Sequence, residues 1–437
     1  MPAWAAVLGT LTLTASAGTS WAAVTTTRVS VSTTGDEITT HGGFHPSISA
    51  DDRFVVFASR AANLVPGDTN QRMDVFLRDL TGHTTRRVSL TDAGGQAAEG
   101  ASNGQISADG RFVAFQSGSK DLLSRGRRDT NGSAPDVFVR NLKQGTTRLV
   151  SRNTRGEQGR HDTLLWDISG TGRYVLFSTR SRNFPPLGKA TDAAQALFLR
   201  DRHTRRTVWV PGSVTEPGTF RIQQAQVSDN GRFVAFAVQG RRKRRVLADL
   251  ATGRKTHLEC TVVACTTLMV DDLSPAGRFV SLTTFSNAGP RNIVLYDAHA
   301  KTESLVSVDS NGVPGNNLSM ASALARGARF VVYASRATNL VPGDTNDAWD
   351  VFRLNRVTGG VDRVDLTAGG GQIPTGIGPL LDPTALPCLR TGLSDERRGV
   401  LAVSRDGSVV VFATDDGSVV AADTNNLCDI FARGDGL

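Results

Sequence analysis

Short apolar runs alternate with polar segments rich in Gly, Asp and Asn along most of the chain. In the run FVVF (54–57), Phe54 and Val56 point to one face of an extended chain, and Val55 and Phe57 point to the other. A strand that is apolar on both faces has to be covered on both sides. No long stretch keeps the period of 3.6 residues that a packed helix needs. The pattern therefore predicts an all-β protein made of short strands joined by turns.

One nine-residue phrase, S-x-D-G-R-F-V-x-F, recurs seven times with some erosion. A short apolar segment precedes each copy, a run such as DVFLRDL (74–80) follows it, and in most units a third run such as TTRRVS (84–89) comes next. The apolar segment, the phrase and the two following runs make four predicted strands in each complete unit. The copies of the phrase are SADDRFVVF (49–57), SADGRFVAF (107–115), SGTGRYVLF (169–177), SDNGRFVAF (228–236), SPAGRFVSL (274–282), ARGARFVVY (325–333) and SRDGSVVVF (404–412).

Four-stranded sheets that stack face to face around an axis cover both faces of every strand. The last unit ends at DIFARGDGL (429–437) without a fourth strand, whereas TTTRVS (25–30) near the start of the chain is that missing phrase. We therefore predict a seven-bladed β-propeller with four-stranded antiparallel blades. The strand near the N-terminus should pair with the last blade and close the ring.

The phrase S-x-D-G-R, followed by D-[IV]-F-x-x-D, resembles the repeat of TolB-like, WD-repeat-like propellers, which are common in exported bacterial proteins. The resemblance covers nearly all of residues 25–437. It implies the fold more strongly than any activity, since such propellers include binding scaffolds and a few enzymes. The chain departs from TolB itself because it lacks an evident α/β domain before the propeller.

The first 22 residues contain no charged side chain. An apolar stretch from Trp4 to Ala15 and small residues up to Ala22 are typical of a secretory signal peptide cut near Ala22. The alternative is a buried N-terminal strand, and the lack of Lys or Arg before the apolar stretch leaves open a start further upstream. We expect residues 23–437 to form one propeller domain, with an insertion at 366–400 before the last blade. No later segment is apolar enough to span a membrane.

The chain carries a net charge of +8, and its densest basic run is RRKRR (241–245). This run is interpreted first as a solvated turn between two strands and second as a patch for polyanions. We expect no nucleic-acid partner, because no aromatic residues alternate with these charges. The predicted partners are a protein or a polysaccharide at the loop-rich face of a monomer.

Four cysteines fit an exported protein. Their spacing does not match a zinc site. We predict two disulfides, Cys260–Cys265 and Cys388–Cys428.

The phrase N-L-V-P-G-D-T-N occurs at 63–70 and again at 339–346, and shorter forms of its Asp-Thr-Asn occur in two further units. It lies in the loop between the second and third strands of a blade. The spacing of the oxygen-bearing side chains resembles that of calcium-binding loops, and calcium needs about six to eight oxygens. The candidate ligands are Asp68, Asn70 and Asp74; Asp129, Asn131 and Asp136; Asp344, Asn346 and Asp350; and Asp423, Asn425 and Asp429.

A structural role is the first interpretation of these loops, ahead of calcium binding. Asp and Asn side chains form hydrogen-bonded turns with their own backbone, and a long connection needs such internal partners. Calcium is therefore kept only as a candidate cofactor.

The sequence lacks the G-x-S-x-G and H-E-x-x-H motifs of common hydrolases. His83, His203, His257 and His299 are predicted in turns on the rim opposite the Asp-Thr-Asn loops, while His41, His45 and His161 lie near the innermost strands. Some TolB-like propellers are metal-dependent lyases of pectin fragments with several His residues at the channel mouth, a pattern that this chain does not reproduce.

The sequence favours a secreted, non-enzymatic binding or scaffold propeller for a carbohydrate or an envelope protein. The alternative is a carbohydrate-active lyase or hydrolase with its site at the channel mouth. We expect a ligand site where the insertion overhangs the channel. Its candidate residues are His45, His161, Asp382, Arg390 and Asp395.

Overall fold

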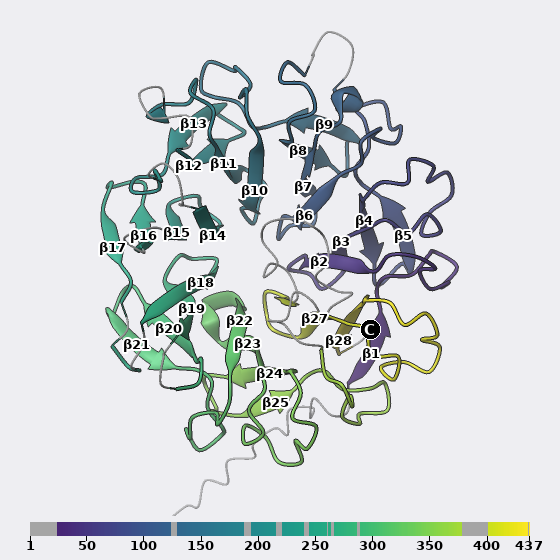
Figure 1. Ribbon diagram of the computed structural model, residues 1–437, viewed down its shortest axis with the longest axis vertical. Helices are drawn as coiled ribbons and strands as arrows, with labels where there is room; N and C mark the ends of the chain where they lie inside the picture. The colour runs from purple at the N-terminus through teal and green to yellow at the C-terminus, as the bar shows by residue number, and fades with distance from the viewer. Residues whose placement is uncertain are drawn as a thin grey trace, which may run out of the picture.

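The computed structural model describes residues 24–123, 129–187, 194–215, 221–239, 244–259, 261–263, 266–285, 289–377, 401–435 and 437. These residues form seven four-stranded antiparallel sheets arranged around a central axis, as Figure 1 shows. Two short 3-10 turns, Lys120–Leu122 and Arg326–Ala328, accompany the strands. The predicted seven-bladed propeller is confirmed.

The blades follow one another along the chain, each with its first strand nearest the axis (Figure 1). Blade 1 contains β2 (Gly43–Ile48), β3 (Phe54–Ser59), β4 (Asp74–Asp79) and β5 (Thr84–Arg87). Blade 2 contains β6 (Ser102–Ile106), β7 (Phe112–Ser117), β8 (Asp136–Asn141) and β9 (Thr146–Leu149). Blade 3 contains β10 (Thr163–Ile168), β11 (Tyr174–Thr179), β12 (Ala196–Asp201) and β13 (Arg206–Trp209).

The remaining blades repeat this order. Blade 4 contains β14 (Arg221–Val227), β15 (Phe233–Gln239), β16 (Arg244–Asp249) and β17 (Lys255–His257). Blade 5 contains β18 (Thr267–Leu273), β19 (Phe279–Phe285), β20 (Ile293–Asp297) and β21 (Thr302–Leu305). Blade 6 contains β22 (Ser319–Leu324), β23 (Phe330–Ser335), β24 (Asp350–Asn355) and β25 (Val361–Arg363).

Blade 7 joins the two ends of the chain. It contains β26 (Leu401–Val403), β27 (Val409–Thr414) and β28 (Asp429–Gly434), and its fourth strand is β1 (Thr25–Arg28). The register pairs Thr25 with Gly434 and Arg28 with Phe431. Each innermost strand contacts the innermost strands of both neighbouring blades, including β26 and β2. The N-terminal strand therefore closes the ring, as predicted.

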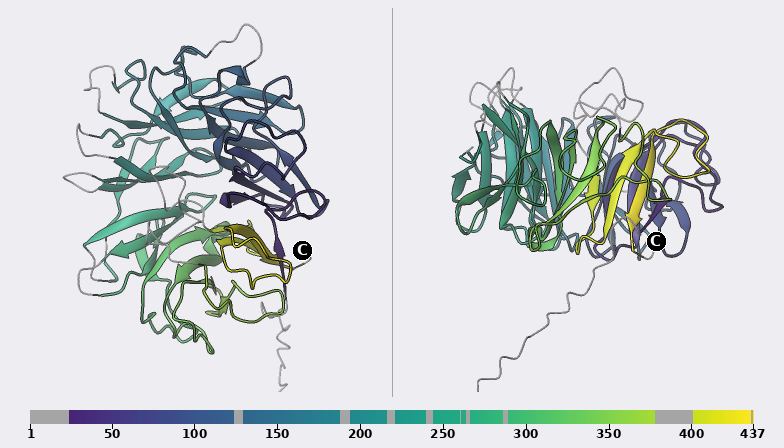
Figure 2. Two further views of the ribbon diagram at one scale, coloured as in Figure 1. Left: turned by 45° about the vertical axis from the view of Figure 1, so that its right-hand side comes forward. Right: turned by 90° about the horizontal axis from the view of Figure 1, so that it is seen from below.

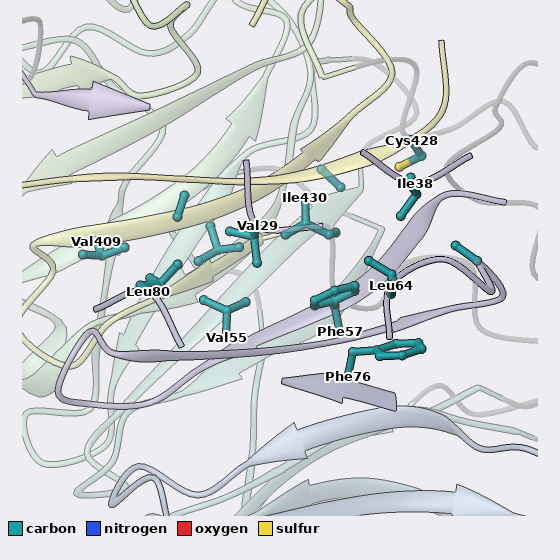
Figure 3. Close-up of a cluster of buried hydrophobic side chains, with 14 residues drawn as sticks. Val29, Ile38, Val55, Phe57, Leu64, Phe76, Leu80, Val409, Cys428 and Ile430 are labelled. Atoms are coloured by element: carbon teal, nitrogen blue, oxygen red, sulfur yellow. The ribbon is translucent and has the colours of Figure 1, made fainter. Parts of the chain in front are cut away.

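Apolar side chains fill the spaces between blades from both faces of each strand. Val55 and Phe57 of β3 face blade 7 and pack with Val29 and Ile430, which the close-up in Figure 3 shows. Val56 of β3 points the other way and packs against blade 2. Figure 2 shows the blades side by side around the ring, seen at an angle and from the edge. The two-faced pattern of the sequence thus predicts the packing correctly.

The repeated phrase folds into the turn between the first and second strands. In blade 1 the Ser49 hydroxyl donates to the Asp51 carboxylate and accepts from the Phe54 amide at 3.0 Å. Arg53 donates to Asp79 at the end of the third strand at 2.8 Å. The fourth residue of the phrase has positive φ; it is glycine in five blades, Asp52 in blade 1 and Ala328 in blade 6. In blade 3 a Cβ on Gly172 would collide with the ring of Phe112 from blade 2. The phrase therefore builds both the turn and the contact between blades.

Several other predictions can be located. Residues 241–243 of the basic run lie outside the described residues, and Arg244 begins β16, which fits a turn between strands. The side chains of Arg244 and Arg245 donate to the carbonyls of Val214 and Leu268. His83, His203 and His299 lie in turns between third and fourth strands as predicted, whereas the prediction for His257 is wrong, because this residue ends the fourth strand β17 (Lys255–His257).

The predicted signal peptide (1–22), Cys260, Cys265 and Cys388 also lie outside the described residues. Cys428 is buried, and the described residues include no free cysteine. Within the described part of the chain, no helix is long and apolar enough to cross a membrane.

Residues 366–377, the first part of the predicted insertion, are described. Leu366 bridges to Gln372 in the same way that Leu90 bridges to Gln96 between blades 1 and 2. This part therefore repeats the ordinary connection between blades. Residues 378–400 lie outside the described residues.

Candidate functional site

A pocket of about 280 Å³ lies in the central channel, lined by the first strands of all seven blades. One position contributes strongly to its lining, namely the residue two places before the first residue of each repeated phrase. That residue is polar in five blades and alanine in two: Ser47, Gln105, Asp167, Gln226, Asp272, Ala323 and Ala402. The pocket therefore combines polar side chains on most of its wall with a less polar segment at blades 6 and 7.

Two of these side chains tie neighbouring blades together. The carboxylate of Asp167 accepts hydrogen bonds from the amides of Ile168 (2.7 Å) and of Val227 in blade 4 (2.8 Å). Asp272 does the same with Leu273 and with Leu324 in blade 6, at 2.7 and 2.8 Å. In six blades the first strand carries a β-bulge. The amides bound by the aspartates lie outside these bulges, in first strands that form the inner edge of each sheet and have a partner strand on one side only. The aspartates supply acceptors for amides at this edge.

Asp271 adds a third carboxyl group beside Asp272. Its Oδ2 accepts from the hydroxyls of Thr283 and Ser322, both at 2.8 Å. Burial raises the pKa of Asp167 to about 8 and the pKa values of Asp271 and Asp272 to about 7, because a poorly hydrated carboxylate is unfavourable. These three groups change protonation near neutral pH, unlike ordinary aspartates.

The Asp-Thr-Asn loops lie at the end of each blade opposite to the turn of the repeated phrase, because successive hairpin connections of an antiparallel sheet alternate between its ends. In blade 1 the side-chain amide of Gln96 donates to Asp68 at 2.8 Å and to Asp74 at 3.2 Å. Its oxygen accepts from the Thr69 amide at 3.2 Å. Gln96 belongs to the connection that leads into blade 2, so the loop and the connection are held together.

A buried arginine completes the blade-1 cluster, which we define as Asp68, Asn70, Asp74, Arg87 and Gln96. The Arg87 guanidinium lies 3.7 Å from Asp68 and 3.9 Å from Asp74, and its side chain is only 6% exposed. Asn70 donates to Asp74 at 3.1 Å and to the Ala97 carbonyl at 2.9 Å. The positive charge of Arg87 therefore already lies beside Asp68 and Asp74, two of the calcium ligands predicted from the sequence.

Blades 6 and 7 build the same cluster. In blade 6 Arg363 lies 3.5 Å from Asp344, and Gln372 donates to Asp344 at 3.1 Å. In blade 7 Arg28 lies 3.3 Å from Asp423, and Glu37 replaces the glutamine. Burial raises the pKa of the last aspartate of each loop, Asp350 in blade 6 and Asp429 in blade 7, to about 6.

Blade 2 keeps the carboxylates and loses the arginine. Leu149 stands at the position of Arg87, since Leu149 pairs with Phe138 as Arg87 pairs with Phe76. Gln158 then makes more of the contacts and donates to Asp129 (2.8 Å), Asn131 (3.0 Å) and Asp136 (2.5 Å). Burial raises the pKa of Asp136 to about 6.

The predicted ligand-site residues are not brought together by the described structure. His45 lies in β2 of blade 1 with a φ of +55°, and His161 is exposed just before β10 of blade 3. Asp382, Arg390 and Asp395 lie outside the described residues. Over the ranges given above, no group of three or more His, Cys, Asp or Glu side chains is arranged to hold a metal ion.

Sequence reasoning missed two sets of residues. The Gln of the connections recurs in the same context, as GGQ (94–96), GEQ (156–158) and GGQ (370–372), and this second repeat could have identified it. The channel aspartates Asp167 and Asp272 also had a signal, because both interrupt apolar strands two places before the repeated phrase.

No family model and no curated protein matches this chain. Solved structures do match. An oligogalacturonate lyase from Vibrio parahaemolyticus is 11% identical with a TM-score of 0.54, and an oligogalacturonate lyase in complex with manganese is 11% identical with a TM-score of 0.55. Each match covers 94% of this chain and 93% of the lyase.

TolB from Acinetobacter baumannii also matches, with 13% identity over 66% of this chain and a TM-score of 0.40. The match spans 58% of the length of that TolB. At these identities the likenesses concern the fold. The propeller architecture predicted from the repeated phrase is confirmed by the seven four-stranded sheets themselves.

Proposed function

We propose that this protein is an exported, non-enzymatic binding propeller that holds a small neutral carbohydrate in its central channel. One observation carries the proposal: all seven blades direct side chains into a single pocket of about 280 Å³. A concave pocket with converging polar groups and shifted pKa values is the usual form of a small-ligand site. A protein partner would need a larger, flatter surface than this pocket offers.

The lining suits hydroxyl groups. The carboxamides of Gln105 and Gln226 donate and accept hydrogen bonds, and Asp167 and Asp272 donate as well when they are protonated. Trp166 contributes an apolar surface to the same pocket. A ligand that carries carboxylates is disfavoured, because these aspartates repel it once they ionise.

A carbohydrate-active lyase or hydrolase is the second candidate. The pKa values of about 7 to 8 in the channel are in the range that general acid–base catalysis uses at neutral pH. The likeness to oligogalacturonate lyases supports this candidate through the fold alone. We favour binding, because each of the three carboxyl groups already accepts hydrogen bonds that join neighbouring blades.

The remaining parts of the proposal rest on the sequence. They are export after cleavage near Ala22, one domain over residues 23–437, and the disulfides Cys260–Cys265 and Cys388–Cys428. For the Asp-Thr-Asn loops we propose a structural role, supported by the arginine that lies beside the carboxylates in three blades.

The test measures binding and turnover together. Purified protein is titrated with neutral oligosaccharides and with oligogalacturonate, with and without manganese, by calorimetry, and each mixture is then analysed for products by chromatography. Saturable binding of a neutral sugar without products is expected. Release of unsaturated or shortened products would favour the lyase or hydrolase instead.

A matched pair of variants locates the site. Ala323→Trp fills the channel at the position of Asp272 in the neighbouring blade, and we expect it to weaken sugar binding at least tenfold. Ala251→Trp adds the same side chain to an exposed turn in blade 4 and should leave binding unchanged. Equal binding by both variants would rule out the channel as the site.

A further inference from the structure

A second, larger cavity lies at the outer side of blade 3, far from the channel strands. We call it the blade-3 groove; its volume is about 720 Å³. Three segments line it: the connection from blade 2 (Asn153–Glu157), the loop after β11 (Asn183–Pro186) and the outermost strand β13 (Arg206–Trp209). None of these segments takes part in the proposed channel site.

Aromatic and proline rings form the apolar part of the groove. Phe184 and Phe198 are buried with their rings 5.1 Å apart and make its floor. Trp209 is 37% exposed, one of few large apolar side chains so exposed among the described residues. Pro185 and Pro186 are exposed on the loop that lines the groove with it. A partly exposed indole ring beside a ring-lined floor is a hydrophobic surface that a ligand could bury further.

The comparison with blade 1 explains why the groove exists. Trp209 pairs with Phe198 as Arg87 pairs with Phe76, so an indole stands where blade 1 has its guanidinium. The two loops begin alike: Asn63 donates to the Glu37 carbonyl at 2.7 Å, and Asn183 donates to the Gln158 carbonyl at 2.8 Å. Blade 3 has therefore kept the start of the loop and placed an aromatic ring where blade 1 has its arginine.

Charged groups stand at the edge of the aromatic surface. Arg155 and Arg206 are exposed, both line the groove, and neither forms an ion pair within the described part of the chain. Glu157 also lines the groove, and its carboxylate accepts from the side-chain amide of Asn153 at 2.7 Å. The lining side chains thus carry a net charge of plus one, with two guanidinium groups available to an anion.

We propose that the blade-3 groove binds an oligosaccharide that contains uronic acids. The apolar C–H face of a pyranose ring packs on an indole, whose negative face attracts the slightly positive hydrogens. A guanidinium binds a carboxylate through two parallel hydrogen bonds, which Arg155 and Arg206 can each supply. This pairing of an aromatic platform with free arginines fits alternating sugar faces and carboxylates.

An acidic peptide is the strongest competitor for the groove. Its carboxylates would also pair with the arginines, and grooves lined by aromatic residues bind extended peptides. However, the backbone amide and carbonyl of Thr207 in β13 are both occupied by the Thr154 hydroxyl, at 3.1 and 2.9 Å. A peptide cannot use that part of the strand edge for pairing, so the saccharide is favoured.

The experiment measures binding of a mannuronate hexamer to the full chain by calorimetry, with cellohexaose as the neutral probe and hexaglutamate as the acidic peptide. We expect saturable binding of the uronate that weakens as salt rises, and little binding of the other two. Trp209→Ala should weaken uronate binding at least tenfold, and Trp209→Phe should restore part of it.

A charge-matched control separates contact from net charge. Arg155→Ala/Arg206→Ala should weaken uronate binding at least tenfold, whereas Arg60→Ala/Arg326→Ala removes two exposed arginines elsewhere and should change it less than twofold. Thermal melting of each variant establishes that it is folded. Equal binding by wild type and Trp209→Ala, equal loss in both arginine pairs, or preference for hexaglutamate would overturn the proposal.

Uronate binding in the blade-3 groove should not depend on the channel pocket. Ala323→Trp should leave uronate binding unchanged, because Ala323 lies in the first strand of blade 6. Loss of uronate binding in that variant would transfer the site to the channel and overturn the groove.

Discussion

Blades 1 and 3 solve the same packing problem with opposite chemistry. At the position opposite the central phenylalanine of the third strand, blade 1 buries Arg87 between two carboxylates, and blade 3 exposes Trp209 above a second phenylalanine. The strands, their register and the first hydrogen bond of the loop are shared. The comparison teaches that a propeller blade tolerates an indole in place of the arginine at this position.

Partial replacement is more costly. A buried charge without its partner is strongly unfavourable, so the arginine and the carboxylates are expected to change together. Blade 2 illustrates the intermediate state. It has Leu149 in place of the arginine and keeps Asp129 and Asp136, and Gln158 donates to both carboxylates there.

The largest effect is expected from breaking the blade-1 cluster. Arg87→Ala leaves Asp68 and Asp74 buried without a cation and should lower the free energy of unfolding by about 3–5 kcal/mol. Urea denaturation measures this loss. Arg60→Ala, an exposed arginine of the same blade, should change the free energy by less than about 0.5 kcal/mol. Equal effects of the two substitutions would contradict the role of Arg87 as the cation that stabilises Asp68 and Asp74.

Blade 2 has no arginine at the position of Arg87, and adding one tests whether a cation stabilises the buried carboxylates. The pH dependence of the free energy of unfolding provides the measurement. The pKa of Asp136 is about 6 in the folded chain, above the ordinary aspartate value of 3.8 that applies once the chain unfolds, so the folded state holds its proton more tightly. Its contribution to stability therefore falls as pH rises from about 4 to 6 and stays constant above that.

Leu149→Arg should lower the pKa of Asp136 and remove this fall. The expected gain relative to wild type is about 1 kcal/mol at pH 8, with no gain at pH 4, where the carboxyl is protonated in the folded state. Urea midpoints measured at both pH values check it. A gain of the same size at pH 4 would mean that the arginine acts through packing.

Replacing the bridging glutamine, Gln96, should lower the free energy of unfolding less than Arg87→Ala does. Gln96→Ala removes hydrogen bonds to Asp68, Asp74 and the Thr69 amide and should cost about 1–2 kcal/mol. Gln144→Ala, in an exposed turn of blade 2, is the matched control and should be neutral. The idea fails if the melting temperatures of both variants equal that of wild type.

The smallest effect belongs to blade 3. Trp209→Ala removes a side chain that is already partly in water, so unfolding should lose less than about 1 kcal/mol. The same substitution is expected to weaken uronate binding tenfold. A loss of stability as large as that of Arg87→Ala would mean that the indole is a core residue and not a binding surface.

The fold was accessible from the sequence because each blade repeats the same short phrases. The seven copies, the two-faced strands and the closing strand near the N-terminus were all predicted, and the pairing of Thr25–Arg28 with β28 confirms the last. A repeat makes long-range pairing local, since every strand mainly contacts its own unit and its neighbours.

The candidate sites were harder to predict for physical reasons. Arg87 and Gln96 meet Asp68 from segments 19 and 28 residues later in the chain, and only the folded hairpins bring them together. The blade-3 groove requires the connection at Asn153–Glu157 to lie against the outermost strand of the following blade. Exposure of Trp209 depends on that arrangement, which composition alone cannot reveal.

The pairing of β1 with β28 also determines how the ring would respond to force. Thr25 lies opposite Gly434, and Arg28 lies opposite Phe431, so the first residue of β1 and the last residue of β28 are at the same end of the strand pair. A pull applied between residues 25 and 434 would load the hydrogen bonds one after another and not all at once. We therefore expect β1 to separate from β28 at low force. The hairpins of the other blades should unfold only after this pair has separated.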